Sequence, residues 1–126
     1  MPYSRPAILV VDDEVDARSF LFSLLDSEGF PVTTCEGWND ALRYVAQHKP
    51  AVVVSDVRMP DMDGMELLSK IKHLSPGTLV ILVSAYADDA MYWETLERGG
   101  ENLLTKPFRN EELLRAVQEA LKEVEP

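Results

Sequence analysis

Five polar side chains follow short apolar runs of the sequence, at positions where they could do chemistry together. They are Asp12 and Asp13 after residues 7–11, Asp56 after residues 51–55, Ser84 after residues 78–83 and Lys106 after residues 101–105. Three carboxylates close to one another repel, so a proton or a cation must neutralise them, and their hard oxygens suit Mg²⁺. A divalent cation, an ammonium group and a hydroxyl around one carboxylate would offset the charge of a phosphoryl group. Because a carboxylate nucleophile forms an acyl phosphate, we hypothesise that Asp56 accepts phosphate.

The apolar runs that carry these side chains alternate with helical patterns along the chain. Strand patterns cover residues 7–11, 31–35, 51–55, 78–83 and 101–105, and helical patterns cover residues 15–27, 38–48, 64–73, 88–98 and a last helix, capped by Asn110, that reaches almost to Pro126. This alternation predicts an α/β fold, a doubly wound, five-stranded parallel sheet with five helices in the strand order 2-1-3-4-5. Pro31 and the threonines after it favour an edge position for the second strand. The first and third strand ends, with Asp13 and Asp56, then lie side by side where ligands bind.

The composition excludes several classes of protein. The 126 residues suit one compact domain, and the formal net charge of -10 would repel a nucleic acid backbone or an anionic membrane surface. No apolar run approaches the ~20 residues of a membrane span, and the first residues lack a signal-peptide pattern. A single cysteine, Cys35, cannot form an internal disulfide, which predicts a cytoplasmic protein.

Four segments at these strand ends, taken in order, resemble the receiver domain of two-component response regulators. They are Val11–Glu14, Ser55–Gly64, Val83–Ala87 and Thr105–Phe108. The resemblance covers essentially the whole chain and implies a single flavodoxin-like receiver domain over residues 1–126. It also implies a signalling switch, in which a sensor histidine kinase or a phosphotransfer protein donates the phosphoryl group and the domain changes its partner preference. Such a domain catalyses only its own phosphorylation and dephosphorylation and is not a metabolic enzyme.

The resemblance implies a role for each residue of the site. The phosphoacceptor is Asp56, and the implied Mg²⁺ ligands are Asp56, Asp13, Asp12 (directly or through water) and the backbone carbonyl of Arg58. The groups implied to contact the phosphoryl oxygens are Ser84, Lys106 and the backbone N–H of Ala85. The Lys106–Pro107 bond resembles the family's cis peptide, which would direct Lys106 into the site.

Three positions bear on how such a switch reports phosphorylation and how long it lasts. Many receivers carry Tyr or Phe three residues before the lysine, where this chain has Leu103, so the usual swing of an aromatic side chain is missing. Movement of Ser84 and of the loop after it would still respond to phosphate. Arg58 and Tyr86 occupy the two positions that affect attack by water in the family, and their size predicts a shielded, slowly hydrolysing phosphoryl group.

The resemblance also implies two interaction surfaces. Residues 15–27 and the loop that follows residue 105 correspond to the surface that docks the kinase in the family. Residues 88–98, residues 101–105 and the last helix correspond to the face that contacts output partners or a second copy of the chain.

Two other functions use similar residues. A Mg²⁺-dependent phosphohydrolase of the haloacid-dehalogenase kind also has a strand-end aspartate, but it needs a second aspartate two residues later, where this chain has Arg58. A flavodoxin-like FMN carrier needs a phosphate loop after the first strand, where Asp12, Asp13 and Glu14 would repel a phosphate. Taken singly, the residues also have ordinary interpretations: an acidic pair in a solvated loop, a serine that caps a helix and a surface lysine.

Overall fold

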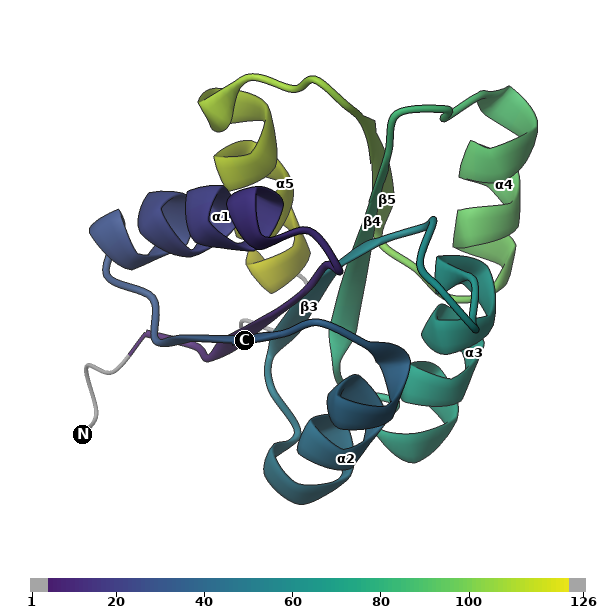
Figure 1. Ribbon diagram of the computed structural model, residues 1–126, viewed down its shortest axis with the longest axis horizontal. Helices are drawn as coiled ribbons and strands as arrows, with labels where there is room; N and C mark the ends of the chain where they lie inside the picture. The colour runs from purple at the N-terminus through teal and green to yellow at the C-terminus, as the bar shows by residue number, and fades with distance from the viewer. Residues whose placement is uncertain (1–4, 123–126) are drawn as a thin grey trace.

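The computed structural model describes residues 5–122 of the chain as a five-stranded parallel sheet with helices on both faces (Figure 1). The strands are β1 (Ile8–Val11), β2 (Val32–Cys35), β3 (Val52–Asp56), β4 (Leu79–Ser84) and β5 (Asn102–Thr105), and the helices are α1 (Val15–Ser27), α2 (Trp38–His48), α3 (Gly64–Leu74), α4 (Asp89–Glu97) and α5 (Asn110–Lys122). The strand order is β2-β1-β3-β4-β5. The predicted fold class and strand order are therefore confirmed.

Two apolar layers hold the helices against the sheet. Successive side chains of a strand point to opposite faces, so β1 sends Ile8 and Val10 into one layer and Leu9 and Val11 into the other. The first layer packs against α1 and α5, and the second packs against α2, α3 and α4 (Figure 1). Because both faces are covered, the interior strands read in the sequence as continuous apolar runs.

The register of the strands brings their carboxyl ends to one edge of the sheet. All the strands are parallel, and Asp56 pairs with Val83 while Ser84 pairs with Thr105. The polar residues at or just after each strand end therefore share this edge. The edge strand β2 exposes Thr33 and Thr34, which agrees with its predicted position.

Some predicted boundaries differ from the structure. Asp56 and Ser84 are the last residues of β3 and β4 rather than the residues after them. The predicted cap Asn110 is instead the first residue of α5, and the Glu112 carboxylate accepts the backbone N–H of Arg109 at 3.1 Å. The predicted continuation of this helix beyond residue 122 lies outside the described residues, as do residues 1–4, where no signal-peptide pattern is expected.

No helix within residues 5–122 has the length and apolar character that a membrane crossing requires.

Candidate functional site

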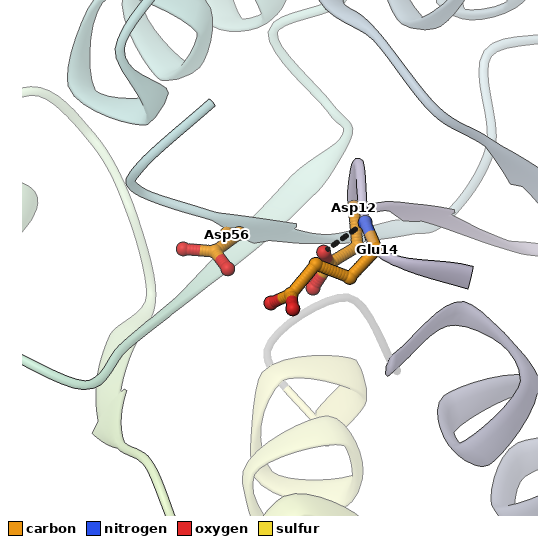
Figure 2. A group of neighbouring side chains, drawn as sticks. All are labelled: Asp12, Glu14 and Asp56. Carbon is orange, nitrogen blue, oxygen red and sulfur yellow. Dashed lines mark hydrogen bonds between the residues drawn. The ribbon is translucent and has the colours of Figure 1, made fainter. Parts of the chain in front are cut away.

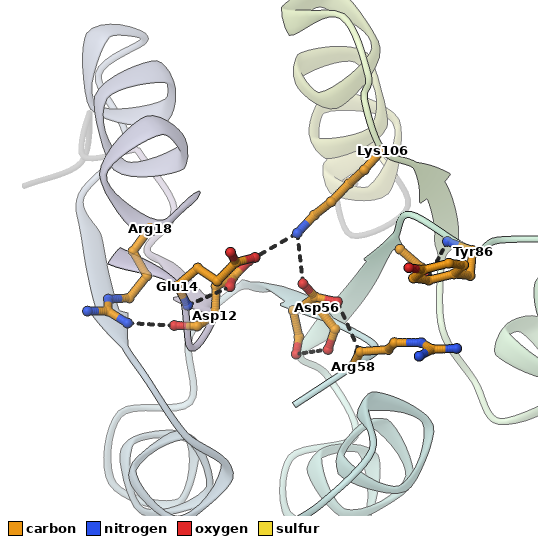
Figure 3. A network of polar contacts seen from close by, with 9 residues as sticks. Asp12, Glu14, Arg18, Asp56, Arg58, Tyr86 and Lys106 are labelled. Atoms are coloured by element: carbon orange, nitrogen blue, oxygen red, sulfur yellow. Dashed lines mark hydrogen bonds and ion pairs between the residues drawn. The ribbon is translucent and has the colours of Figure 1, made fainter. Parts of the chain in front are cut away.

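Two buried carboxylates at neighbouring strand ends share one lysine. Asp12 follows β1 and is fully buried, and Asp56 ends β3 with only 7% of its surface exposed. The Lys106 Nζ lies 3.2 Å from Asp12 Oδ2 and 2.7 Å from Asp56 Oδ2 (Figure 3). Buried charges persist only when they are paired, and here one ammonium group serves two carboxylates. The pair therefore keeps an excess of negative charge that an additional cation would offset.

Lys106 reaches this position from the segment that follows β5. Its backbone N–H donates to the carbonyl of Ser84 at 2.8 Å, and the Lys106–Pro107 bond is cis, as predicted. Burial alone would lower the pKa of Lys106, but the hydrogen bond to Asp56 and the charge of Asp12 together raise its pKa above the usual value. The side chain therefore carries its positive charge throughout the neutral pH range.

A third carboxylate joins Asp12 and Asp56, and it is Glu14 rather than the predicted Asp13. Oxygen atoms of Asp12, Glu14 and Asp56 all lie within 4.8 Å of one another (Figure 2). Asp13 is exposed and lines the cavity over Asp56 without belonging to this group. The only sequence signal for Glu14 is its place directly after the acidic pair. The donor set consists of hard oxygen atoms with surplus negative charge, which fits Mg²⁺.

The turn after β1 is held by hydrogen bonds to Asp12. The backbone N–H of Glu14 donates to Asp12 Oδ1 at 3.0 Å, and Arg18 Nη1 of α1 donates to the Asp12 carbonyl oxygen at 2.8 Å (Figure 3). The sequence prediction did not include Arg18. Its signal is a position one turn into the helix that follows the acidic pair, from which a long side chain can fold back onto the strand end.

The loop between β3 and α3 brings Arg58 beside Asp56. The backbone N–H of Arg58 donates to Asp56 Oδ1 at 2.9 Å. Gly64, at the start of α3, donates its N–H to the Val57 carbonyl, and a Cβ at this position would lie 2.6 Å from the Asp56 carbonyl oxygen. Only glycine fits this close approach, which packs the start of α3 against the end of β3. Asp63 is the N-cap residue of α3, and its carboxylate accepts the backbone N–H groups of Met65 and Glu66.

A cavity of about 320 Å³ opens over Asp56. It is lined by Asp13, Glu14, Asp56, Arg58, Ala85, Tyr86 and Lys106. Two larger hollows lie beside β2 and between α2 and α3, but neither is lined by a buried charged side chain. We therefore regard the cavity over Asp56 as the functional one.

Arg58 and Tyr86 stack on each other where they line this cavity. The Arg58 guanidinium carbon lies 4.2 Å from the centroid of the Tyr86 ring (Figure 3). Tyr86 also donates its backbone N–H to Ser84 Oγ at 3.0 Å. Ser84 is fully buried at the end of β4 and does not line the cavity, although Ala85 beside it does. The Ser84 hydroxyl therefore contacts the backbone of the loop after β4, and its predicted contact with the phosphoryl group stays a prediction.

Leu103, at the expected aromatic position, is part of the core. Only 8% of its surface is exposed, and it belongs to the apolar layer under α2, α3 and α4. The effect of Leu103 on the conformational switch stays a prediction.

Comparison with known proteins gives a family for this site and fold. The response regulator receiver domain matches residues 8–118 of the chain. The chain belongs to this family. As a receiver domain, it has the phosphoacceptor role in two-component signalling, and receiver domains are signalling domains rather than classical enzymes. The haloacid-dehalogenase alternative is not supported.

Three relatives show how far the likeness extends. An uncharacterized 14.6 kDa protein of Leptolyngbya boryana is 40% identical over 114 residues, which cover 89% of this chain and 87% of that protein. The transcriptional regulatory protein GlrR of Escherichia coli K12 is 35% identical over 123 residues, which cover 97% of this chain but only 28% of GlrR. The beryllofluoride-activated NtrC4 receiver domain dimer is 32% identical with a TM-score of 0.88, and the match covers 93% of this receiver and 97% of that chain.

Proposed function

We propose that Asp56 is the residue of this receiver that accepts the phosphoryl group. The observation that carries the proposal is the environment of its carboxylate. It lies at a strand end, almost fully buried, with Lys106 Nζ and the Arg58 N–H within hydrogen-bond distance and a cavity open above it. Positive charge and N–H donors arranged in advance around a carboxylate stabilise the charge that develops during phosphoryl transfer.

The donor is a phosphohistidine of a sensor histidine kinase or of a phosphotransfer protein. A carboxylate oxygen of Asp56 attacks phosphorus, the phosphorus–nitrogen bond breaks and the imidazole leaves, so that an aspartyl phosphate forms. Lys106 neutralises phosphoryl oxygens, and Ser84, whose Oγ accepts the Tyr86 N–H, still has its hydroxyl hydrogen to donate. Ala85, whose backbone N–H is the proposed further donor to the phosphoryl group, also lines the cavity. Loss of the phosphoryl group to water uses the same residues, so the domain catalyses both of its own reactions.

A divalent cation, Mg²⁺, completes the proposal. Asp12, Asp13, Asp56 and the backbone carbonyl of Arg58 are the groups that would hold it, and three of these residues line the cavity. When bound, it supplies positive charge to the acidic cluster and to the phosphoryl oxygens.

The partner surfaces are proposed on contacts of the fold. The ring centroid of Phe20, an exposed residue of α1, lies 6.5 Å from that of Phe108 in the loop before α5. This contact supports a continuous kinase-docking surface formed by α1 and that loop. The dimeric NtrC4 receiver supports homodimer formation. The face formed by α4, β5 and α5 is proposed for this dimer from the family resemblance alone. A single receiver domain over residues 1–126, a cytoplasmic location and the absence of direct nucleic acid or membrane binding remain predictions that rest on the sequence.

Phosphate incorporation tests the proposal directly. The chain should incorporate radiolabelled phosphate from acetyl phosphate in the presence of Mg²⁺, and hydroxylamine should release the label because it attacks acyl phosphates. Asp56→Ala should reduce incorporation to background, while Asp61→Ala, an exposed aspartate of the same loop, should leave it intact. A label that resists hydroxylamine, or one that survives Asp56→Ala, would overturn the assignment.

A further inference from the structure

Glu14 occupies a position where its side chain has no structural task. It is the N-cap residue of α1, with extended backbone angles (φ -93°, ψ 127°), yet its carboxylate makes no hydrogen bond with the helix. Asp, Asn, Ser or Thr would be favoured at an N-cap because a short side chain can accept an N–H of the first turn. A glutamate is therefore a poor choice for stability at this position.

The Glu14 carboxylate instead points toward Asp12 and Asp56. Figure 2 shows the three side chains converging. One carboxylate oxygen of each lies within 4.8 Å of the other two. Among the described residues, neither an ion pair nor a hydrogen bond engages this carboxylate, because Lys106 contacts only the other two. A third like charge at this distance is unfavourable unless a cation joins the group.

We propose that the Glu14 carboxylate is an additional binding group for the divalent cation of this receiver, beyond the aspartates that the family resemblance implies. The inference rests on the proposed function, because it concerns the same cation. Mg²⁺ usually keeps several water molecules, so a carboxylate at the rim contributes either directly or by accepting hydrogen bonds from those waters. The consequence is a tighter cation site than Asp12, Asp13 and Asp56 would form without it.

The chain offers a matched control for the charge of Glu14. Asp16 lies in the first turn of α1, is exposed and does not line the cavity. Glu14→Gln and Asp16→Asn each remove one negative charge from the same end of the same helix, but only the first removes a member of the carboxylate group. A third variant, Glu14→Ser, removes the carboxylate while it supplies a favourable helix cap.

Direct titration with Mg²⁺ by calorimetry, without any phosphodonor, tests the inference. At about 0.15 M salt, where exposed charges are largely screened beyond ~8 Å, Glu14→Gln and Glu14→Ser should weaken binding about tenfold, and Asp16→Asn should change it less than twofold. Glu14→Ser should unfold at the same temperature as the wild type or at a higher one, which separates cation binding from stability.

The possible results lead to different conclusions. If Glu14→Gln and Asp16→Asn weakened Mg²⁺ binding equally, the loss of any nearby negative charge would explain the result, and the role of Glu14 would be overturned. Wild-type Mg²⁺ affinity in both Glu14 variants would overturn it as well. If the wild-type chain bound no Mg²⁺ at millimolar concentrations, the proposed cation site and the role of Glu14 would both be wrong. Phosphate incorporation at Asp56 would still be tested separately by its own label.

Discussion

The two ends of the sheet bury polar groups in opposite ways. At the carboxyl ends of β1 and β3, Asp12 and Asp56 share the ammonium group of Lys106 and face a cavity. At the amino ends of β3 and β4, Ser75 and Thr78 are buried as well, but both are neutral. The hydroxyls of Ser75 and Thr78 lie 2.8 Å apart, and Thr78 Oγ1 donates to the Pro50 carbonyl at 2.8 Å.

A lysine contacts the polar groups at each end, and Lys72 and Lys106 differ in what they contact. Lys72 Nζ donates to the carbonyl oxygens of Pro76 and Thr78, each at 2.8 Å, whereas Lys106 contacts two carboxylates. Within residues 5–122, the buried hydroxyls and the lysine at the amino end all have partners in the protein. The carboxyl end keeps surplus negative charge and open space. The difference indicates that the network at the amino end stabilises the fold, whereas the residues at the carboxyl end are available to bind a ligand.

The largest expected effects come from substituting one residue at each end of the sheet, because one substitution should affect activity and the other stability. Asp56→Asn should abolish phosphate incorporation, while Lys106 keeps Asp12 as a partner and the free energy of unfolding changes little. Thr78→Val should leave incorporation near wild type but lower the free energy of unfolding by about 1–3 kcal/mol, because Ser75 and the Pro50 carbonyl lose a buried partner. Urea unfolding and label incorporation measure the two quantities.

Thr34→Val is the control for Thr78→Val. Thr34 is exposed on β2, and its hydroxyl has no hydrogen-bond partner among residues 5–122, so the change should stay within about 0.5 kcal/mol. The distinction between the two ends would fail if Thr78→Val stopped phosphorylation, or if Asp56→Asn destabilised the fold more than Thr78→Val.

Exchanging each lysine for methionine should give the next largest effect. Lys106→Met should slow phosphate incorporation by about a hundredfold, because a preorganised positive charge is lost from the transition state. The same change should tighten Mg²⁺ binding severalfold, because the ammonium group no longer competes for Asp12 and Asp56. Initial rates and calorimetric titration measure these opposite shifts.

Lys72→Met is the matched comparison at the amino end. It should lower stability without altering either Mg²⁺ affinity or the rate of incorporation. Weaker Mg²⁺ binding in Lys106→Met would mean that Lys106 helps to organise the cation site rather than competing with the cation.

The convergence of residues at the carboxyl end was predictable because these residues lie at strand ends. Short apolar runs mark the strands, and the rules for parallel sheets bring their ends to one edge, so Lys106 and Asp56 could be placed together although 50 positions separate them. The direction of individual side chains was not predictable in this way. Whether Asp13 or Glu14 points toward Asp12 depends on the geometry of one turn, which Glu14 N–H and Arg18 fix through Asp12.

The stacking of Arg58 on Tyr86 is a further contact that the sequence did not predict. The sequence placed both residues beside the site and predicted that they shield it, but their contact depends on side-chain conformations in two loops. Similarly, the sequence did not predict that Ser84 Oγ accepts the Tyr86 N–H, and its contact with the phosphoryl group stays a prediction. Hydrogen bonds between a side chain and nearby backbone are decided by local geometry, which residue type alone leaves open.

Removing the stacked pair should have a smaller effect, on the lifetime of the phosphoryl group. The double variant Arg58→Ala with Tyr86→Ala should lose label severalfold faster than the wild type, because water gains access to Asp56. Trp93→Ala is the control, since Trp93 is an exposed aromatic residue of α4 that does not line the cavity. Decay of purified, labelled protein gives the rates. An unchanged half-life in the double variant would refute shielding.

The smallest expected effect concerns a third group at the carboxyl edge, which the fold keeps neutral. Cys35 ends β2, and burial, followed by the negative charge of Asp40, raises the pKa of its thiol to about 11. The unfolded chain therefore ionises this thiol at lower pH than the folded chain does. The stability that depends on the neutral thiol is complete below the unfolded pKa and is lost as the pH rises toward 11.

The Cys35→Ala variant isolates this contribution from the tyrosines and lysines that titrate in the same range. Between pH 8 and pH 11, the free energy of unfolding of the wild type should fall by about 1–2 kcal/mol more than that of Cys35→Ala, as measured by urea unfolding at each pH. If the free energy of unfolding fell equally in the two proteins, the thiol would ionise at the same pH in the folded chain as in the unfolded chain. In that case burial would not keep the β2 end neutral, and the excess charge at this edge would not be confined to the strands around Asp56.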